Sequence, residues 1–159
     1  MKKIKILWMS DSPNASTGYG TVSRNVLNRL KKNPMYDIKV IAWQFLGQPA
    51  IVDGLEYLPP GKLAFGEDML QEYLDKYQPD ILITLCDLFM LMYMARPTFR
   101  LGKTKWMPYF ACDGYPLPNG TESVLKLATL PISMAKYGQQ VAAVRNLYPD
   151  ELDPHTARS

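Results

Sequence analysis

Apolar residues recur with two different spacings along this chain, and the alternation of the two predicts strands separated by helices. KIKILWM (3–9) is a short apolar run and DILITLC (80–86) a more continuous one, and such runs are typical of buried strands. In YDIKVIAW (36–43) every second residue is apolar from Ile38 to Ala42. Pro108 lies inside one further apolar run and indicates an edge strand or a bulge there. We expect strands at residues 3–9, 36–43, 54–61, 80–86, 105–112 and 130–135.

The intervening segments have the spacing of amphipathic helices. Val22, Val26, Leu27 and Leu30 share one helical face, and Asn33-Pro34 ends that segment. Because strand and helix alternate throughout, the sequence predicts the α/β class. We expect a Rossmann-like three-layer sandwich, in which a mainly parallel sheet has helices on both faces. The helices are expected at residues 21–32, 66–80, 88–95, 121–130 and 136–148.

Length and composition fit a single domain. The chain has 159 residues, of which 47% are hydrophobic, enough for one core. We expect this domain over residues 1–148, with 149–159 as a polar tail or the start of a linker. The first apolar stretch reaches Asp11 too soon for a signal peptide, and the run 81–95 is shorter than the roughly 20 residues that span a bilayer. Two cysteines in apolar runs and one histidine favour a cytoplasmic protein without a metal site or disulfide framework.

Polar residues gather where the predicted strands end. Ligands of open α/β sheets bind outside the carboxyl ends of the strands, so these positions are the candidate site. An aspartate at such a position commonly caps the following helix or turn, but three aspartates at separate strand ends indicate a shared crevice. The candidates are Asp11, Ser12, Thr17, Gly18, Tyr19 and Gly20 after the first strand, Asp87 after the fourth, Asp113, Gly114 and Tyr115 after the fifth, and Ser133, Lys136 and Tyr137 after the last.

The segment DSPNASTGYGTVSRN (11–25) matches neither common phosphate-binding fingerprint. A P-loop needs a lysine that is absent after Gly20, and a dinucleotide fingerprint needs a third glycine where Ser23 stands. Two interpretations remain open: a glycine turn whose helix N-terminus receives a phosphate or a sugar hydroxyl, and a tight entry into a helix. The stretch ASTGYGT is also similar to the hydroxyl-rich loop of flavodoxins, so a flavodoxin-like FMN-binding protein is an alternative.

Four segments in order resemble the N-terminal domain of GT-B glycosyltransferases, in particular glycosyltransferase family 4. They are ILWMSDSPNASTGYGTVSRNVLNRL, QPDILITLCDLF, KWMPYFACDGYPLP and LATLPISMAKYGQQVAAV. The resemblance implies half of a GT-B fold and transfer of a sugar, with retention and without a metal or other cofactor, from a nucleotide-sugar donor to an acceptor. It also implies that Gly18 and Gly20 line the cleft and that Asp87 and Tyr115 contact the acceptor. Asp113 stands where many members have a histidine that faces the sugar, and is the catalytic candidate.

The resemblance also implies a partner for this chain. The donor-binding domain of such enzymes is absent from the sequence, so we expect this chain alone to be inactive and to be part of a longer enzyme. The exposed interdomain face would also allow two copies to dimerise. The net charge of +3 is too small to indicate nucleic-acid binding. A non-enzymatic interaction domain is the remaining alternative, since the basic and aromatic stretch 94–106 would suit a membrane surface, although a solvated loop is favoured there.

Overall fold

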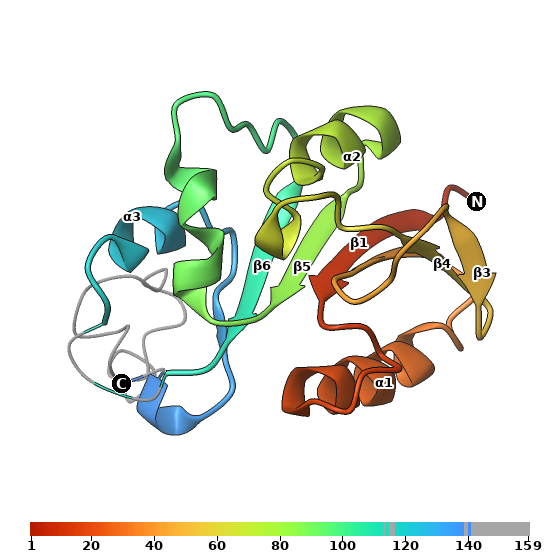
Figure 1. Ribbon diagram of the computed structural model, residues 1–159, viewed down its shortest axis with the longest axis horizontal. Coiled ribbons are helices and arrows are strands. Elements are labelled where there is room, and N and C mark those ends of the chain that lie inside the picture. Colours follow the sequence, from red (N-terminus) through yellow and green to blue (C-terminus); the bar gives the residue numbers. More distant parts are fainter. Residues whose placement is uncertain (113, 115–116, 139, 141–159) are drawn as a thin grey trace.

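A computed structural model describes residues 1–112, 114, 117–138 and 140, and these residues form one seven-stranded sheet (Figure 1). The strand order is β3-β4-β2-β1-β5-β6-β7. All neighbouring strands are parallel except β3 and β4, which form an antiparallel hairpin at one edge. The strands are β1 (Ile4–Ser10), β2 (Tyr36–Ala42), β3 (Ala50–Val52), β4 (Leu55–Leu58), β5 (Ile81–Leu85), β6 (Lys105–Phe110) and β7 (Ile132–Ser133).

Helices cover both faces of the sheet, as the sequence predicts. The α-helix α1 (Gly18–Leu30) lies on one face. The helices α2 (Leu70–Tyr77) and α3 (Thr121–Leu125) lie on the other face, together with the 3₁₀ helices η1 (Ala64–Gly66) and η2 (Leu88–Ala95) (Figure 1). The α/β class and the Rossmann-like three-layer arrangement are therefore confirmed.

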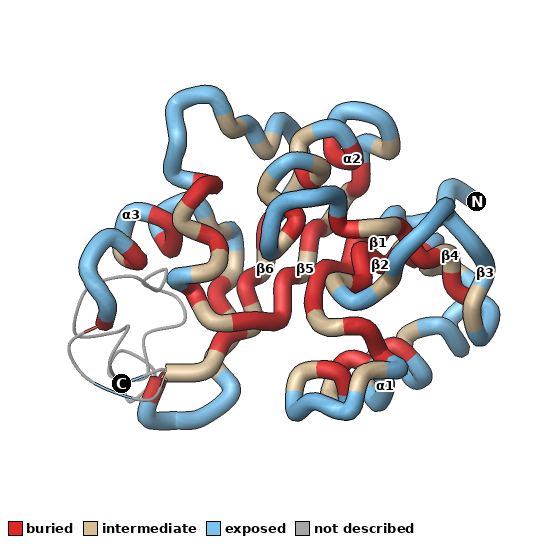
Figure 2. Tube along the Cα trace, in the orientation of Figure 1, coloured by how far each residue is buried: buried red, intermediate tan, exposed pale blue. Residues whose placement is uncertain are grey.

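The pleat of the strands divides the core into two clusters. In β1, Leu7 and Met9 pack with residues of α2, η2 and α3, whereas Ile6 and Trp8 pack on the side of α1. The indole nitrogen of Trp8 donates to the hydroxyl of Ser23 at 3.2 Å, which ties α1 to the sheet. Figure 2 shows the buried positions concentrated along the inner strands. A rigid sheet of this kind fixes where the strand ends lie.

Pro108 does not mark an edge strand, because β6 lies between β5 and β7. The expectation of an edge fails for a local reason. The strand β7 pairs only with Tyr109 and Phe110, so no β7 residue stands opposite Pro108, and its missing N–H removes no bond of that ladder. On its other side Pro108 stands opposite Thr84 of β5.

Several element bounds differ from the sequence prediction. The helix α1 begins at Gly18 rather than Thr21, and the strand β3 was not predicted. The helix α2 begins at Leu70 because Phe65 and Gly66 have positive φ angles of 64° and 77°, which a continuing α-helix excludes. Residues 136–138 and 140 are helical, and the rest of the helix expected at 136–148 lies outside the described residues.

Candidate functional site

The sheet has its topological switch point between β1 and β5. From β1 the chain continues to β2 on one side, whereas β5 and the strands after it lie on the other side. Among the parallel strands the order is that of the doubly wound dinucleotide-binding fold, and it differs from the flavodoxin order. The crevice outside the carboxyl ends of β1 and β5 is thus the place where such folds bind ligands.

The segment between β1 and α1 is held by its own polar side chains. The carboxylate of Asp11 accepts a 2.6 Å hydrogen bond from the hydroxyl of Thr17, and this hydroxyl accepts one of 2.9 Å from the Gly20 N–H. Thr17 is therefore the N-cap of α1, oriented by Asp11. Ser12 is buried, and its carbonyl accepts from the Ala15 N–H at 2.8 Å. Asp11 and Ser12 shape the turn more than they present polar groups to a ligand.

Gln44 joins this group, and sequence reasoning missed it. It follows β2, and its amide nitrogen donates to Asp11 at 2.7 Å while its amide oxygen accepts from the Ser12 N–H at 2.6 Å. The end of the second strand, where a dinucleotide-binding protein places an acid for the ribose, is here occupied by this bridge. The rule that selects strand ends applies to β2 as well, and would have found Gln44.

The two glycines of the turn have different structural roles. A Cβ on Gly20 would lie 2.6 Å from the Ala15 carbonyl oxygen and 2.8 Å from that of Ser12, so only glycine fits there. A Cβ on Gly18 would meet nothing within 4 Å. No described residue accepts a hydrogen bond from the Gly18 N–H, which stands in the first turn of α1. Gly20 therefore serves the fold, and Gly18 is the glycine that a ligand can approach.

Tyr19 connects the turn to the next strand across the switch point. Its hydroxyl donates a 2.6 Å hydrogen bond to the carboxylate of Asp87, the residue two positions beyond β5. Asp87 precedes the 3₁₀ helix η2 but makes no side-chain cap to it. Its carboxylate is half-buried and faces the glycine turn. The carboxylate of Asp87 therefore does not cap η2 but links the end of β5 to the turn after β1.

Cys86 directly precedes Asp87 and is buried. Burial raises the pKa of its thiol far above the ordinary value, and the negative charges of Asp87 and Asp11 raise it further. Burial and a raised pKa are typical of a structural cysteine rather than of a reactive one.

The remaining candidates follow β6 and β7. Asp113 and Tyr115 lie outside the described residues, and Gly114 is exposed. The Ser133 hydroxyl donates to the Ala135 carbonyl at 2.7 Å and shapes a local turn. Three strand spacings of about 4.8 Å put the end of β7 roughly 14 Å from the end of β1.

Lys136 and Tyr137 follow this turn, and both are exposed. A Cβ on Gly138 would lie 2.3 Å from the Ser133 Oγ and 2.8 Å from the Cys112 Cβ, so the turn packs closely on the end of β6. The structure thus brings Ser133 and Cys112 together, but keeps them apart from the group around Asp11. The candidate residues are therefore spread along the strand ends rather than gathered in one compact cluster.

Trp43, also beyond the end of β2, carries an unpaired polar atom. Its indole nitrogen is enclosed and has no hydrogen-bond partner among the described residues. The ring packs edge-on against Phe65, with 5.1 Å between the ring centroids. An enclosed donor without a partner costs about 1–3 kcal/mol, so this indole is a local source of instability beside the crevice.

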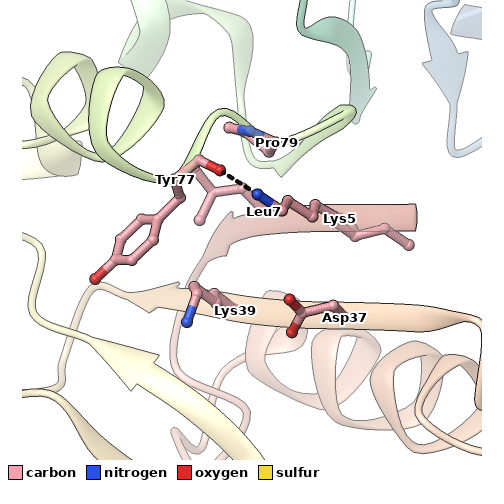
Figure 3. Close-up of a pocket in the computed structure, with 7 residues that line it drawn as sticks. Lys5, Leu7, Asp37, Lys39, Tyr77 and Pro79 are labelled. Carbon is pink, nitrogen blue, oxygen red and sulfur yellow. Dashed lines mark hydrogen bonds between the residues drawn. The ribbon is translucent and has the colours of Figure 1, made fainter. Parts of the chain in front are cut away.

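A small cavity lies at the opposite, amino-terminal end of β1 and β2 (Figure 3). Its volume is about 100 Å³, and Lys5, Asp37, Lys39 and Tyr77 are among its lining residues. The Lys5 ammonium donates to the Tyr77 carbonyl at 3.2 Å. Lys39 forms an ion pair with Glu56, and its ammonium lies 4.6 Å from the centroid of the Tyr77 ring. Both lysines are thus engaged within the fold, and this cavity is not a candidate active site.

The described residues contain neither a metal site nor a membrane-spanning helix. No group of three or more His, Cys, Asp or Glu side chains there has the geometry of a metal site. None of the helices in the same part of the chain has the length and apolar character needed to cross a membrane. The sequence matches no protein-family model and no curated protein.

Proposed function

We propose that this chain is the acceptor-side domain of a glycosyltransferase that moves a sugar from a nucleotide-sugar donor to an acceptor. The observation that carries the proposal is the hydrogen bond between Tyr19 and Asp87, which joins the glycine turn after β1 to the end of β5 at the switch point. Sugar transfer needs a crevice in which a carboxylate and main-chain N–H groups face the same ligand. Asp87 supplies the carboxylate, and Gly18 supplies an N–H at the N-terminus of α1.

The spread of the strand-end candidates supports the same proposal. They extend from the turn after β1 to the turn after β7, and a nucleotide sugar together with its acceptor is an elongated ligand. The strand order gives no support to the flavodoxin-like alternative, since flavodoxins have a different order. In the proposed enzyme, Asp87 orients acceptor hydroxyls, and the donor-binding domain is supplied from outside these residues.

The test uses the complete gene product that contains these residues. It is incubated with a panel of nucleotide sugars and candidate acceptors, and release of the nucleoside diphosphate is measured. Asp87→Asn should lower kcat/KM by at least about tenfold, because a hydrogen bond to a charged group is worth about 1.5–3 kcal/mol. The matched control is Asp75→Asn, an exposed aspartate of α2, which should leave the rate unchanged.

Two results would overturn the proposal. One is the absence of nucleoside diphosphate release with every donor and acceptor tested. The other is a protein that purifies yellow, with the absorption spectrum of a bound flavin, which would establish the flavodoxin-like alternative instead.

A further inference from the structure

A polar groove lies between α1 and the β3–β4 hairpin, and Pro13 and Asn14 of the turn after β1 also line it. Its volume is about 370 Å³, within the range of about 300–1,000 Å³ that small-molecule sites have. Figure 1 shows α1 on this face of the sheet, with its C-terminal end toward β3. The polar side chains that line the groove are Asn14, Arg24, Asn28, Lys31 and Asp53.

Two cations of α1 face this groove, and neither forms an ion pair with a described residue. Arg24 donates one hydrogen bond of 3.2 Å to the Pro13 carbonyl, and Lys31 donates one of 2.9 Å to the Asp53 carbonyl. These two bonds orient the side chains and leave their other N–H groups unused. Seven residues of helix separate the two cations by about 10 Å along the axis.

The groove also offers partners for hydroxyl groups. Asn28 lies between the two cations on the same helical face, and neither its amide nor that of Asn14 has a side-chain hydrogen bond within the described part of the chain. An amide donates and accepts, as a sugar hydroxyl does. The carboxylate of Asp53 adds an acceptor. Its charge offsets only one of the two cations, so the groove keeps a net positive charge.

The floor of the groove is apolar and ends in one buried hydroxyl. Leu27, Leu55 and Tyr57 line it, and Tyr57 is only 2% exposed. No described residue forms a hydrogen bond with the Tyr57 hydroxyl. Among the described residues, the Trp43 indole nitrogen is the one side-chain polar atom that is both fully enclosed and without a hydrogen-bond partner. The Tyr57 oxygen also lacks a partner, so it is not fully enclosed. It therefore keeps access to the groove and is an unused donor at its base.

We propose that this groove binds an anionic sugar, which is a hydroxylated ring that carries a phosphate or a carboxylate. Arg24 and Lys31 pair with the anion, the two asparagines and Asp53 bind ring hydroxyls, and the apolar floor contacts the C–H face of the ring. This proposal does not depend on the proposed transfer reaction, since the groove includes none of the strand-end candidates.

The test is a binding titration of the 159-residue chain by isothermal calorimetry at low ionic strength. The probes are glucose 6-phosphate, glucuronate, glucose and inorganic phosphate. Glucose 6-phosphate or glucuronate should bind at least about tenfold more tightly than glucose and than phosphate alone. Glucose lacks the contacts to the two cations, phosphate lacks the contacts to the ring, and each set of contacts is worth about 1.5 kcal/mol or more. The probe that binds more tightly shows whether the groove prefers a phosphate or a carboxylate.

Variants locate the binding. Arg24→Gln and Lys31→Gln should each weaken binding about tenfold, and Tyr57→Phe should weaken it several-fold while the charges stay in place. The matched controls Arg29→Gln and Lys32→Gln remove exposed cations that do not line the groove, and should leave the affinity unchanged. Thermal unfolding of each variant verifies the fold.

Three results would each overturn the inference. They are no binding of either anionic sugar, equal affinity for the anionic sugar and inorganic phosphate, and equal loss of affinity in Arg24→Gln and Arg29→Gln. Binding that survives in Asp87→Asn supports a site separate from the crevice, so the failure of one proposal leaves the other intact.

Discussion

The hydroxyl of Tyr19 and the carboxylate of Asp87 lie 2.6 Å apart, although 68 positions separate them in the sequence. One residue stands in the first turn of α1, and the other stands just beyond β5. Each belongs to a segment that the sheet places at its switch point. The pair is the contact by which two separate loops become one site.

This pair should contribute measurably to stability. We expect Tyr19→Phe to lower the free energy of unfolding by about 1 kcal/mol, because the bond is charge-assisted but only partly shielded from water. Urea unfolding measures the change, and combination with Asp87→Asn in a double-mutant cycle isolates the pairwise energy. The control is Tyr137→Phe, at a residue that is 47% exposed. An unchanged midpoint in Tyr19→Phe would contradict the contact.

The two glycines of the turn should respond differently to alanine. Gly20→Ala places a Cβ against two backbone carbonyl oxygens, and we expect a loss of about 1–3 kcal/mol. Gly18→Ala meets open space in the first turn of a helix, and should leave the stability unchanged or slightly raised. Thermal unfolding of the two variants gives the comparison. Equal losses would show that the turn is not packed as described.

Gly18 should matter for activity instead. Gly18→Val should abolish sugar transfer by the complete enzyme, since the branched side chain would occupy the space over the free N–H, while the fold persists. Nucleoside diphosphate release and the circular dichroism spectrum are measured on the same preparation. Full activity in this variant would remove the turn from the site.

Thr17 should act as a helix cap. Thr17→Ala removes the acceptor of the Gly20 N–H and should cost about 1 kcal/mol of unfolding free energy. Thr17→Ser keeps the hydroxyl and should restore most of the loss, which separates the cap from any packing of the methyl group. Chemical denaturation of the two variants tests this. A loss of the same size in both would argue for packing alone.

Alkaline pH should weaken the fold through Tyr73. Burial, followed by the charges of Tyr77, Glu72 and Asp68, raises the pKa of Tyr73 to about 12, above the ordinary value of 10.0. A raised pKa of an acid stabilises the folded state fully below pH 10, and this stabilisation is lost as the pH rises from 10 to 12. Tyr73→Phe should therefore lose less stability over this interval than the parent protein. Identical pH profiles of the urea midpoint would refute the assignment.

The architecture could be predicted from the sequence because its signals are local. Short, mainly apolar runs at 3–9 and 80–86 indicated inner strands, and the spacing of Val22, Val26 and Leu30 indicated the helix after the first of them. The strand β3 was not predicted because Ala50 and Ile51 are both exposed, so the segment shows no alternation of buried and exposed positions. The start of α1 was placed late because glycine is a poor helix former, whereas here Thr17 caps the turn and Gly20 is required by close packing.

The site could be predicted only in part. The rule of strand ends selected Tyr19 and Asp87 as candidates, but the hydrogen bond between them depends on which strands are neighbours, and sequence spacing does not give that. Sequence reasoning missed Gln44 because this position was tested only for the acid that dinucleotide-binding proteins have there. Asp11 was selected for chemistry, yet both of its carboxylate oxygens hold the turn. Whether a polar residue binds a ligand or the chain itself is decided by tertiary contacts.

The three tryptophans report on different parts of the molecule in fluorescence experiments. Trp8 and Trp106 are fully buried, and each indole donates to a hydroxyl, Ser23 Oγ and Thr84 Oγ1 respectively. Trp43 is half-buried, stands beyond β2 and has no such bond. Its fluorescence is therefore the signal most sensitive to changes at the strand ends, while the other two emitters follow the integrity of the core. A protein in which only Trp43 remains would carry a native probe at the carboxyl-terminal edge of the sheet.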